Sequence, residues 1–431
     1  MKPTVKKLRN GMSVLLIPHH AADSATVQVF CTVGSRYETK EINGASHFIE
    51  HLMFKGTKKR PNAQAISREL DRYGAAYNAY TSKEFTTFFI KISADKISNA
   101  ADMLNDMVFH SAYDAKEIER ERGVVIEEIN MYEDNPIMRI DLLMEASLFP
   151  NSSLGWDVAG PRSVIRNITR KQLVDYRDAF YAPDRVTIAV AGKIPKNILQ
   201  ILNKTFGTVR PPSLKLRGTA SRAHAYETCS LPKKLKAIAV ESKQTEQTQV
   251  GIGFYGVNHS DKHEPAIKVM SIILGGYMSS RLFTEVRERR GLCYSVSAGH
   301  ECFDDTGVFS IYAGLDSKRL PLAMKTIYTE LDRMKSTLVS DEEIKRAKDH
   351  VKGTLALAFE DSATHASWYG REWALRRELE SPSARIAQLN AVTRADIRSA
   401  ARLVFQPDRM AIAAIGPLVK GAGLDKKLKW E

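Results

Sequence analysis

Two histidines and a glutamate near the start of this 431-residue chain have the types and spacing of a metal site. His47, Glu50 and His51 form the pattern H-x-x-E-H. On a helix, residues four apart lie on one face about one turn apart, so both imidazoles would point the same way with Glu50 beside them. Imidazoles are common zinc ligands, and a neighbouring carboxylate can accept a proton from an activated water. The pattern therefore predicts a zinc site with Glu50 as its proton-transfer group, the alternative being a coincidence of unrelated helix residues.

The histidines need a rigid element to hold them, and the flanking sequence predicts a helix on a sheet. Ser46 is a plausible N-cap before an amphipathic run, and residues 55–57, Lys-Gly-Thr, would end the helix. Segments rich in β-branched residues precede it and predict strands. These preceding strands are 11–18 and 26–33; further predicted strands are 75–81 and 85–93, and further predicted helices are 63–73, 95–110 and 114–132.

A third ligand is expected from the acidic helix 114–132, which carries five glutamates. Glu121 and Glu128 are seven apart and therefore share a face within about 20°. Val124, Val125 and Ile129 could tie that region to the core, and a carboxylate near apolar packing is a better metal ligand than a solvated one. Spacing favours Glu128 over Glu127 only weakly, so the choice stays open at this point.

The composition is that of an ordinary globular protein, with 43% hydrophobic residues and a formal charge of +13. The basic residues are mostly scattered among acids, which favours a solvated surface over nucleic-acid binding. No apolar run approaches the roughly 20 residues of a membrane span, and the amino terminus does not resemble a signal peptide, so we expect a cytoplasmic protein that binds neither nucleic acid nor membrane. The four cysteines show no CxxC pair and predict no disulfide framework.

The second half of the chain repeats the first at an offset of about 220 residues, which indicates a domain duplication. Pro211 and Pro212 open a polar, basic interruption, so we expect a first domain at 1–210, a linker at 211–235 and a second domain at 236–431. Segment 247–255 corresponds to the strand before the histidine helix.

The repeat offers an internal comparison for the predicted site. The segment corresponding to the histidine helix, 266–274, contains no His or Glu. Matching the acidic helices places Ala347 opposite Glu121 and Thr354 opposite Glu128. The scaffold therefore does not need these polar residues, which argues against a purely structural role and predicts one metal centre per chain.

Three segments, HFIEHLMFKGT, GAAYNAYTSKEFTTFF and IERERGVVIEEI, resemble the pitrilysin family, which includes insulin-degrading enzyme, the mitochondrial processing peptidase and short bacterial two-domain peptidases. The resemblance implies a glutamate ligand about 76 residues after the histidine motif, which selects Glu128. The implied set is one Zn²⁺ held by His47, His51 and Glu128, with Glu50 as the general base. Glu121 matches a glutamate that the family places seven residues before the ligand.

The resemblance also implies the fold and the substrate contacts. It implies an α+β protein of two homologous domains, each a mixed or antiparallel sheet packed with helices, arranged as a clamshell around a chamber. Arg287 and Tyr294 match an arginine and a tyrosine that the family extends from its second domain towards the catalytic site, where they could stabilise an oxyanion. Asn78, Ala79 and Tyr80 resemble an edge strand to which an extended peptide adds.

These expectations converge on a zinc endopeptidase acting on peptides or unfolded segments. One competing class is a non-catalytic core or assembly subunit derived from a processing peptidase, and another is a nucleic-acid-binding protein driven by the charge of +13. Since the chain carries both the zinc set and Arg287 with Tyr294, a monomer or homodimer is favoured over an obligate heterodimer. Manganese or cobalt as the physiological ion stays open.

Overall fold

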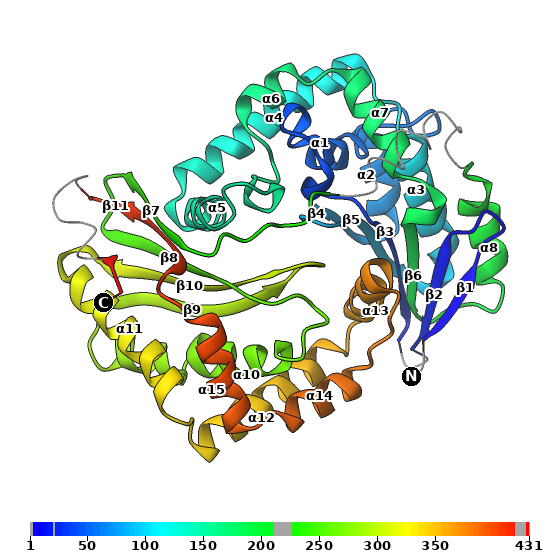
Figure 1. The fold of residues 1–431 in the computed structure, drawn as a ribbon. Coiled ribbons are helices and arrows are strands. Elements are labelled where there is room, and N and C mark those ends of the chain that lie inside the picture. Colours follow the sequence, from blue (N-terminus) through cyan, green and yellow to red (C-terminus); the bar gives the residue numbers. More distant parts are fainter. Residues whose placement is uncertain (1–2, 20–21, 211–225, 419–427, 431) are drawn as a thin grey trace. The chain divides into compact units, whose positions relative to one another are not determined.

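Two mixed β-sheets with corresponding strand orders organise the chain (Figure 1). The computed structural model describes residues 3–19, 22–210, 226–418 and 428–430. The first sheet has the order β1 (Thr4–Lys7), β2 (Ser13–Pro18), β6 (Val186–Gly192), β3 (Ser24–Cys31), β5 (Thr86–Ser93), β4 (Ala76–Thr81). The second has the order β7 (Leu235–Ser242), β11 (Arg409–Gly416), β8 (Gln247–Tyr255), β10 (Gly307–Asp316), β9 (Cys293–Cys302). Apart from β1, the orders match strand for strand, and β2 with β6 and β7 with β11 are the parallel pairs. The predicted α+β fold of two homologous domains is confirmed.

In both halves, one helix or more follows the strand β3 or its counterpart β8, and a run of helices separates the last two strands along the chain. Those of the first half are α1 (Ala45–Leu52), α2 (Ala63–Arg72), α3 (Ile97–His110), α4 (Ala115–Asp134), α5 (Pro136–Leu148), α6 (Arg162–Asn167), α7 (Arg170–Phe180) and α8 (Ile198–Lys204). Those of the second half are α10 (Glu264–Gly275), α11 (Leu320–Ser336), α12 (Asp341–Ala358), α13 (Ser362–Arg376), α14 (Pro382–Ala391) and α15 (Arg394–Val404). Among the described residues, no helix has both the length and the hydrophobicity that crossing a membrane requires.

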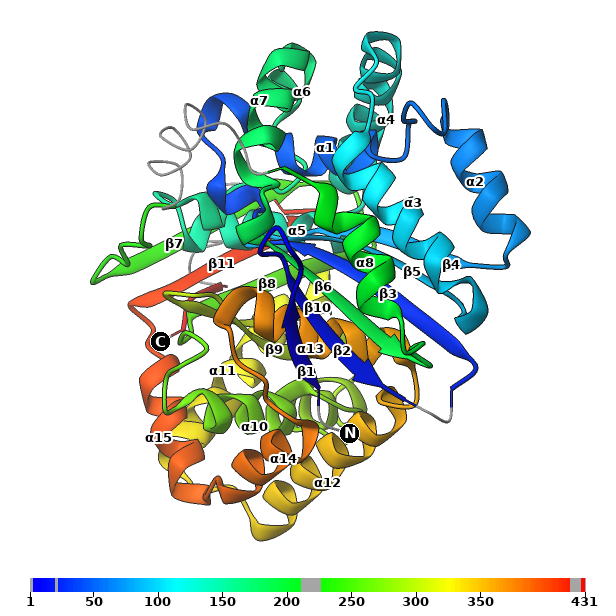
Figure 2. The ribbon, with the colours of Figure 1, turned by 90° about the vertical axis from the view of Figure 1, so that its right-hand side faces the viewer.

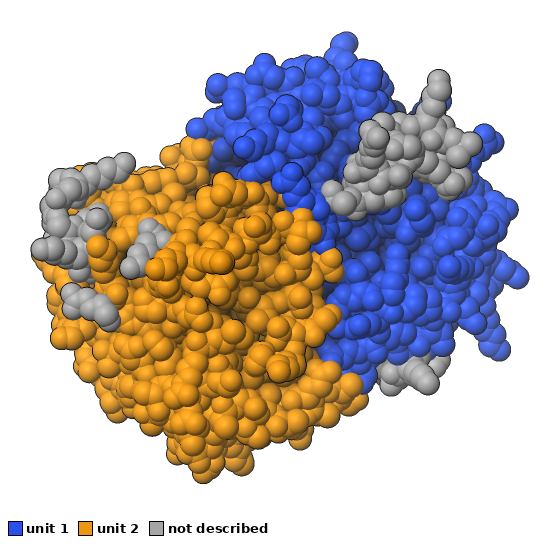
Figure 3. Space-filling model, in the orientation of Figure 1, with its two compact units in different colours: residues 1–129, 156–227, 355–381 blue, residues 130–155, 228–354, 382–431 orange. Residues whose placement is uncertain are grey.

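The chain divides into two compact units that are not continuous halves (Figure 3). Unit 1 comprises residues 1–129, 156–227 and 355–381, and unit 2 comprises 130–155, 228–354 and 382–431. The domains expected at 1–210 and 236–431 thus exchange one segment each. Residues 211–225 of the expected linker lie outside the described residues.

The exchange follows from the two apolar faces of each sheet. In unit 1, Val27 and Val29 of β3 point into the core formed with α1 and α3, whereas Phe30 points to the opposite face. That face is covered by α13, the orange helix beside β3 and β6 in Figures 1 and 2. Gly370 permits this contact, because a Cβ atom there would lie 2.3 Å from the Phe30 ring. A sheet that is apolar on both faces needs helices on both, and the second half of the chain supplies the missing one.

Unit 2 is built in the same way, with α5 from the first half as the exchanged helix. Ile140, Met144 and Leu148 of α5 pack on β8 and β11, while α10, α11 and α15 cover the other face. Gly253 of β8 allows the close approach, since a Cβ atom would lie 2.2 Å from the Met144 sulfur. The corresponding helices α5 and α13 therefore perform reciprocal roles in the two units.

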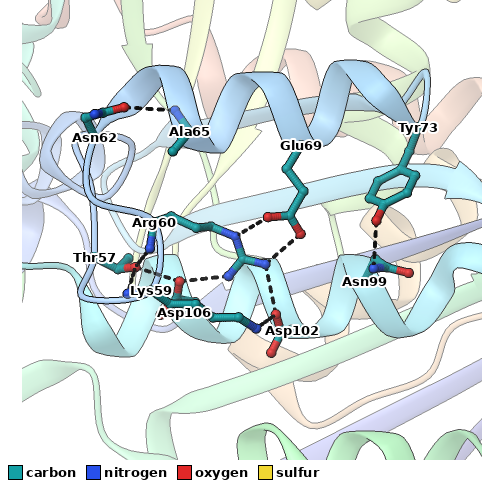
Figure 4. Close-up of polar contacts among 10 residues, drawn as sticks. All are labelled: Thr57, Lys59, Arg60, Asn62, Ala65, Glu69, Tyr73, Asn99, Asp102 and Asp106. Atoms are coloured by element: carbon teal, nitrogen blue, oxygen red, sulfur yellow. Dashed lines mark hydrogen bonds and ion pairs between the residues drawn. The ribbon is translucent and has the colours of Figure 1, made fainter.

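A buried arginine fixes the segment that follows α1 (Figure 4). The Arg60 side chain is 4% exposed and donates hydrogen bonds to Glu69 of α2 at 2.7 Å from both Nε and Nη2. Its Nη1 lies 2.8 Å from Asp106 of α3, and its Nη2 lies 2.9 Å from Asp102. Thr57 also donates to Asp106, at 2.7 Å. This cluster ties residues 57–60 to two helices at once.

Replacing Arg60 should show how much the cluster contributes to the free energy of unfolding. Arg60→Met leaves three carboxylates without their shared cation, and we expect the free energy of unfolding to fall by about 3 kcal/mol, because breaking a buried ion pair on one side leaves uncompensated charge. Arg120→Met, which removes an exposed arginine paired with Glu117 on one helix, should change it by about 0.5 kcal/mol or less. Urea unfolding followed by circular dichroism measures both, and equal changes would contradict the assigned role.

Candidate metal centre

Helix α1 is capped by a glutamate from the preceding loop. The helix begins at Ala45, and its N-cap is Gly44, with φ of 97°, so the prediction of Ser46 as N-cap was wrong. Glu38 accepts hydrogen bonds from the backbone N–H groups of Gly44 and Ser46, both at 2.7 Å, and from Asn43 Nδ2 at 2.9 Å. Burial raises the pKa of Glu38 to about 6, although these hydrogen bonds oppose the shift. Glu38 thus satisfies the helix end that the sequence assigned to a serine.

The two histidines of α1 meet Glu128 of α4 in unit 1. The Nε2 atoms of His47 and His51 lie 3.2 Å apart. The Glu128 Oε2 atom lies 3.5 Å from His47 Nε2 and 3.3 Å from His51 Nε2. Two ligands about 2.0 to 2.1 Å from a tetrahedral zinc ion lie about 3.3 Å from each other. The three donor atoms therefore have the separations that one four-coordinate ion requires, with a fourth position left for another ligand.

Glu121 contacts His51 at Nδ1, the ring nitrogen that does not face Glu128. Its Oε1 lies 2.8 Å from His51 Nδ1 and its Oε2 lies 2.7 Å from Lys55 Nζ, and its side chain is 3% exposed. Burial acts to raise the pKa of Glu121, but the contacts with His51 and Lys55 outweigh it and lower that pKa. A carboxylate that accepts a hydrogen bond from Nδ1–H leaves Nε2 of the same ring available for a metal.

Glu127 and Glu128 are adjacent on α4 but have different surroundings. Glu128 reaches the histidines, whereas Glu127 is exposed. Val125 and Ile129 are buried, as expected, but Val124 is 47% exposed, so its predicted contribution to the core was wrong. Helix α4 therefore presents Glu121 and Glu128 to α1 and turns Glu127 to solvent.

The pKa values of the two histidines are shifted in opposite directions. Burial and the neighbouring His51 lower the pKa of His47 to about 4. Burial also acts to lower the pKa of His51, but the hydrogen bonds to Glu121 and Glu128 outweigh it and raise that pKa to about 9. A proton on His51 thus compensates two carboxylates, and a divalent cation can take over this compensation while the proton is released. The residues present fit a bound zinc ion.

Glu50 lies beside the histidines and is held by the sheet. Thr81, the last residue of β4, donates a hydrogen bond from Oγ1 to Glu50 Oε2 at 2.5 Å. Burial raises the pKa of Glu50, and the Thr81 hydrogen bond opposes the shift. The contact links the proton-transfer candidate to the end of β4.

The predicted peptide-binding residues lie on β4, which is an edge strand of its sheet. Asn78 and Tyr80 are exposed, and Ala79 is buried. The edge position gives an additional strand access to one side of β4, where the Ala79 N–H donates to Asn78 Oδ1 at 2.9 Å. That Asn78, Ala79 and Tyr80 bind a peptide stays a prediction.

Arg287 and Tyr294 belong to unit 2 and lie together there. Arg287 lies on the π-helical segment η7 (Phe283–Glu288), and Tyr294 lies on β9. The guanidinium carbon of Arg287 lies 4.6 Å from the Phe283 ring centroid and 5.3 Å from that of Tyr294. Tyr294 is 72% exposed. The structure brings the two predicted residues together, and their action on a substrate stays a prediction.

The positions that correspond to the metal set are different in unit 2. Ala347 on α12 is buried and Thr354 is exposed. Helix α10, the counterpart of α1, begins at Glu264, two residues before the predicted start, so the predicted start was wrong. Segment 266–274 contains no His or Glu, and the earlier start adds one carboxylate at the first position of the helix.

Sequence reasoning missed Glu38, Lys55 and Thr81. Glu38 lies outside α1, and Thr81 is the last residue of a strand, so helical spacing from His47 cannot find either. Lys55 lies after the end of α1 at Leu52 and contacts Glu121 on α4, so helical spacing does not find it either.

Two family models match successive parts of this chain. The model described as "Insulinase (Peptidase family M16)" matches residues 13–162, which include all three candidate ligands. The model described as "Peptidase M16 inactive domain" matches residues 167–351. The second match covers Arg287 and Tyr294.

The chain is similar over nearly its whole length to curated bacterial proteins. It is 35% identical over 409 residues to the uncharacterized zinc protease YmxG of Bacillus subtilis, covering 95% of this chain and 97% of that protein. It is 32% identical over 415 residues to an uncharacterized zinc protease of Streptomyces coelicolor, covering 95% and 89%. A solved protease from Helicobacter pylori has the same fold, with a TM-score of 0.88 at 23% identity over 96% of this chain and 99% of that chain.

Metal titration should distinguish the roles of Glu121, Glu127 and Glu128 on α4. Relative to the wild type, Glu121→Gln should weaken zinc binding about 10- to 100-fold, because it removes the partner that orients His51. Glu128→Gln should weaken it further, because it removes a donor atom, whereas Glu127→Gln should leave the affinity unchanged. Competition with a chromophoric chelator measures each affinity. Equal weakening by Glu127→Gln and Glu128→Gln would exclude the proposed ligand set.

Proposed function

The chain belongs to peptidase family M16, the insulinase family, and on that premise we propose that it is a zinc-dependent endopeptidase. The substrates would be peptides or unfolded polypeptide segments. The observation that carries the proposal is the convergence of His47, His51 and Glu128 at 3.2 to 3.5 Å, with Glu50 adjacent on the same helix.

His47, His51 and Glu128 would hold the metal. A zinc ion bound there would supply a lowered pKa for a bound water and polarisation of a peptide carbonyl. Glu121 would keep His51 oriented through the 2.8 Å contact with Nδ1. These residues position the reaction without themselves exchanging protons with the substrate.

Glu50 would act as the general base and then as the general acid. Its carboxylate would accept the proton of the attacking water and later deliver it to the leaving amine nitrogen. Its Oε2 accepts the Thr81 hydrogen bond, which would aim the other oxygen of the same carboxylate. Burial raises the pKa of Glu50, and this brings its proton affinity closer to that of a base that works near neutral pH.

Strand β4 would receive the substrate as an added strand. An extended peptide pairs with a sheet edge through main-chain hydrogen bonds, which accept many side-chain sequences. Because Thr81 at the end of β4 contacts Glu50, a peptide paired along Asn78, Ala79 and Tyr80 would run towards the proton-transfer group. This arrangement supports peptides over folded proteins as substrates.

Unit 2 would contribute Arg287 and Tyr294 to the stabilisation of the reacting carbonyl oxygen. A guanidinium and a phenol can both donate hydrogen bonds to a developing oxyanion. Since one chain carries these residues and the metal set, a monomer or homodimer would suffice for activity.

A non-catalytic subunit is the second candidate, because residues 167–351 match a model described as an inactive domain. The candidate metal ligands lie outside that match, in the part of the chain that matches the insulinase model. The full set of His47, Glu50, His51 and Glu128 therefore favours the enzyme.

Glu50→Gln tests the base directly. We expect this variant to bind zinc as the wild type does and to lose about 10²- to 10⁴-fold in turnover, because an amide cannot accept the proton. Cleavage of a mixed peptide library followed by mass spectrometry, with zinc content measured on both proteins, gives the two readouts, and Glu127→Gln is the matched control. Equal cleavage by wild type and Glu50→Gln would reject Glu50 as base, and zinc binding without cleavage by either would favour the non-catalytic subunit.

Arg287→Ala tests the contribution of unit 2. Turnover should fall about 10²- to 10³-fold at unchanged zinc content, as expected when an oxyanion donor is removed. Arg289→Ala, which removes a nearby arginine that is 66% exposed and pairs with Glu285, is the control and should retain activity. The same peptide assay measures both, and unchanged turnover of Arg287→Ala would remove Arg287 from the mechanism.

A further inference from the structure

A second cluster of metal-ligating side chains lies in unit 2, outside the proposed catalytic site. Glu264, His300 and Cys302 each offer one ligand atom, and these atoms all lie within 4.8 Å of one another. The Cys302 sulfur lies 3.7 Å from His300 Nδ1 and 3.8 Å from its Nε2. Ligands at about 2.3 Å for sulfur and 2.0 to 2.1 Å for nitrogen around a tetrahedral ion lie about 3.6 Å apart. The sulfur–Nδ1 separation is close to that value.

Two structural elements bring the cluster together. His300 and Cys302 are two residues apart on β9, so their side chains leave the same face of the strand. Glu264 is the first residue of α10, which packs against β9. The close approach of the two elements is seen at Gly275, where a Cβ atom would lie 2.4 Å from the Ala298 nitrogen.

The carboxylate of Glu264 is already oriented by an arginine. Arg385 donates from Nη1 to Oε2 at 2.7 Å and from Nη2 to Oε1 at 2.6 Å. Burial acts to raise the pKa of Glu264, but Arg385 outweighs it and the pKa is lowered, so the group is ionised. A carboxylate offers about four lone pairs, and this pair of hydrogen bonds uses two. Arg385 thus resembles the outer hydrogen-bond partners that orient metal-binding carboxylates.

The imidazole of His300 is in the neutral form that binds metals. Burial lowers its pKa to about 4, and the charges of Lys268, His259 and Arg385 act in the same direction, while Glu264 opposes them. Its Nε2 accepts a long hydrogen bond of 3.4 Å from the Val257 N–H, so Nδ1 is the ring nitrogen that we assign to the metal.

We propose that Glu264, His300 and Cys302 form a second metal site in unit 2, which binds a divalent transition-metal ion of the zinc type. A thiolate, an imidazole and a carboxylate are a donor set that zinc prefers over calcium or magnesium. The thiolate and carboxylate each bring a negative charge to the ion, the carboxylate being shared with Arg385, and binding releases the Cys302 thiol proton to solvent. The site is independent of the proposed peptidase activity, because it shares no residue with the His47, His51 and Glu128 set.

Cobalt(II) titration of the purified full-length chain distinguishes the two sites. Only the second site holds a sulfur donor, so only it can give a cobalt–thiolate charge-transfer band in the near ultraviolet. We expect this band in the wild type, its loss in Cys302→Ser and in His300→Ala, and its retention in Cys293→Ser, which removes a cysteine from the other end of β9. It should also persist in His51→Ala, in which the first site is disabled.

A second readout needs no variant and therefore no assumption about folding. Zinc should slow alkylation of Cys302 by iodoacetamide at least about 10-fold, with the modified peptides quantified by mass spectrometry, while Cys293 alkylates at an unchanged rate. No cobalt–thiolate band in the wild type, a band that survives Cys302→Ser, or equal alkylation of Cys302 with and without zinc would each overturn the proposal. These outcomes do not depend on whether the protein cleaves peptides.

Discussion

The contact between His51 and Glu121 is the constraint on which the candidate metal centre depends. It joins α1 to α4, two helices separated by α2, two strands and α3 along the chain. A buried carboxylate that accepts from an imidazole fixes both the rotation of the ring and the distance between the helices. With that distance set, Glu128, two turns further along α4, comes within 3.3 Å of His51. The same contact therefore orients one ligand and brings in another.

The supports of α1 are polar and come from outside the helix. Glu38 satisfies the N–H groups at its start, and the Arg60 cluster holds the segment after its end. Both devices bury charge, which is costly unless each charge is paired and hydrogen-bonded. Their position on either side of the two histidines indicates that α1 is held rigidly, as a preorganised site requires.

The two units have the same sheet topology apart from β1 but different side chains at the positions of the metal site. The strand orders agree, and α5 and α13 each cover the sheet built mainly from the other half of the chain. Where α1 carries two histidines, α10 carries apolar residues and a glutamate at its first position. The family-model match to an inactive domain agrees with the loss of the first metal set from this half. The Glu264, His300 and Cys302 cluster uses the start of α10 and the end of β9, so it is not a remnant of that set.

The sequence by itself determined features that depend on local spacing or on internal repetition. Helical spacing put His47 and His51 on one face, and self-similarity predicted two homologous domains, because periodicity depends only on neighbours along the chain. Tertiary structure decided the rest. It selected Glu128 over Glu127 on geometry, which spacing could not do and a family resemblance had to supply. It showed that Glu38, and not Ser46, satisfies the N–H groups at the start of α1, and that α5 and α13 pack on the sheet of the other half of the chain. It also brought Glu264 close to His300 and Cys302. Such contacts between distant segments depend on how whole elements pack and leave no periodic signal in the sequence.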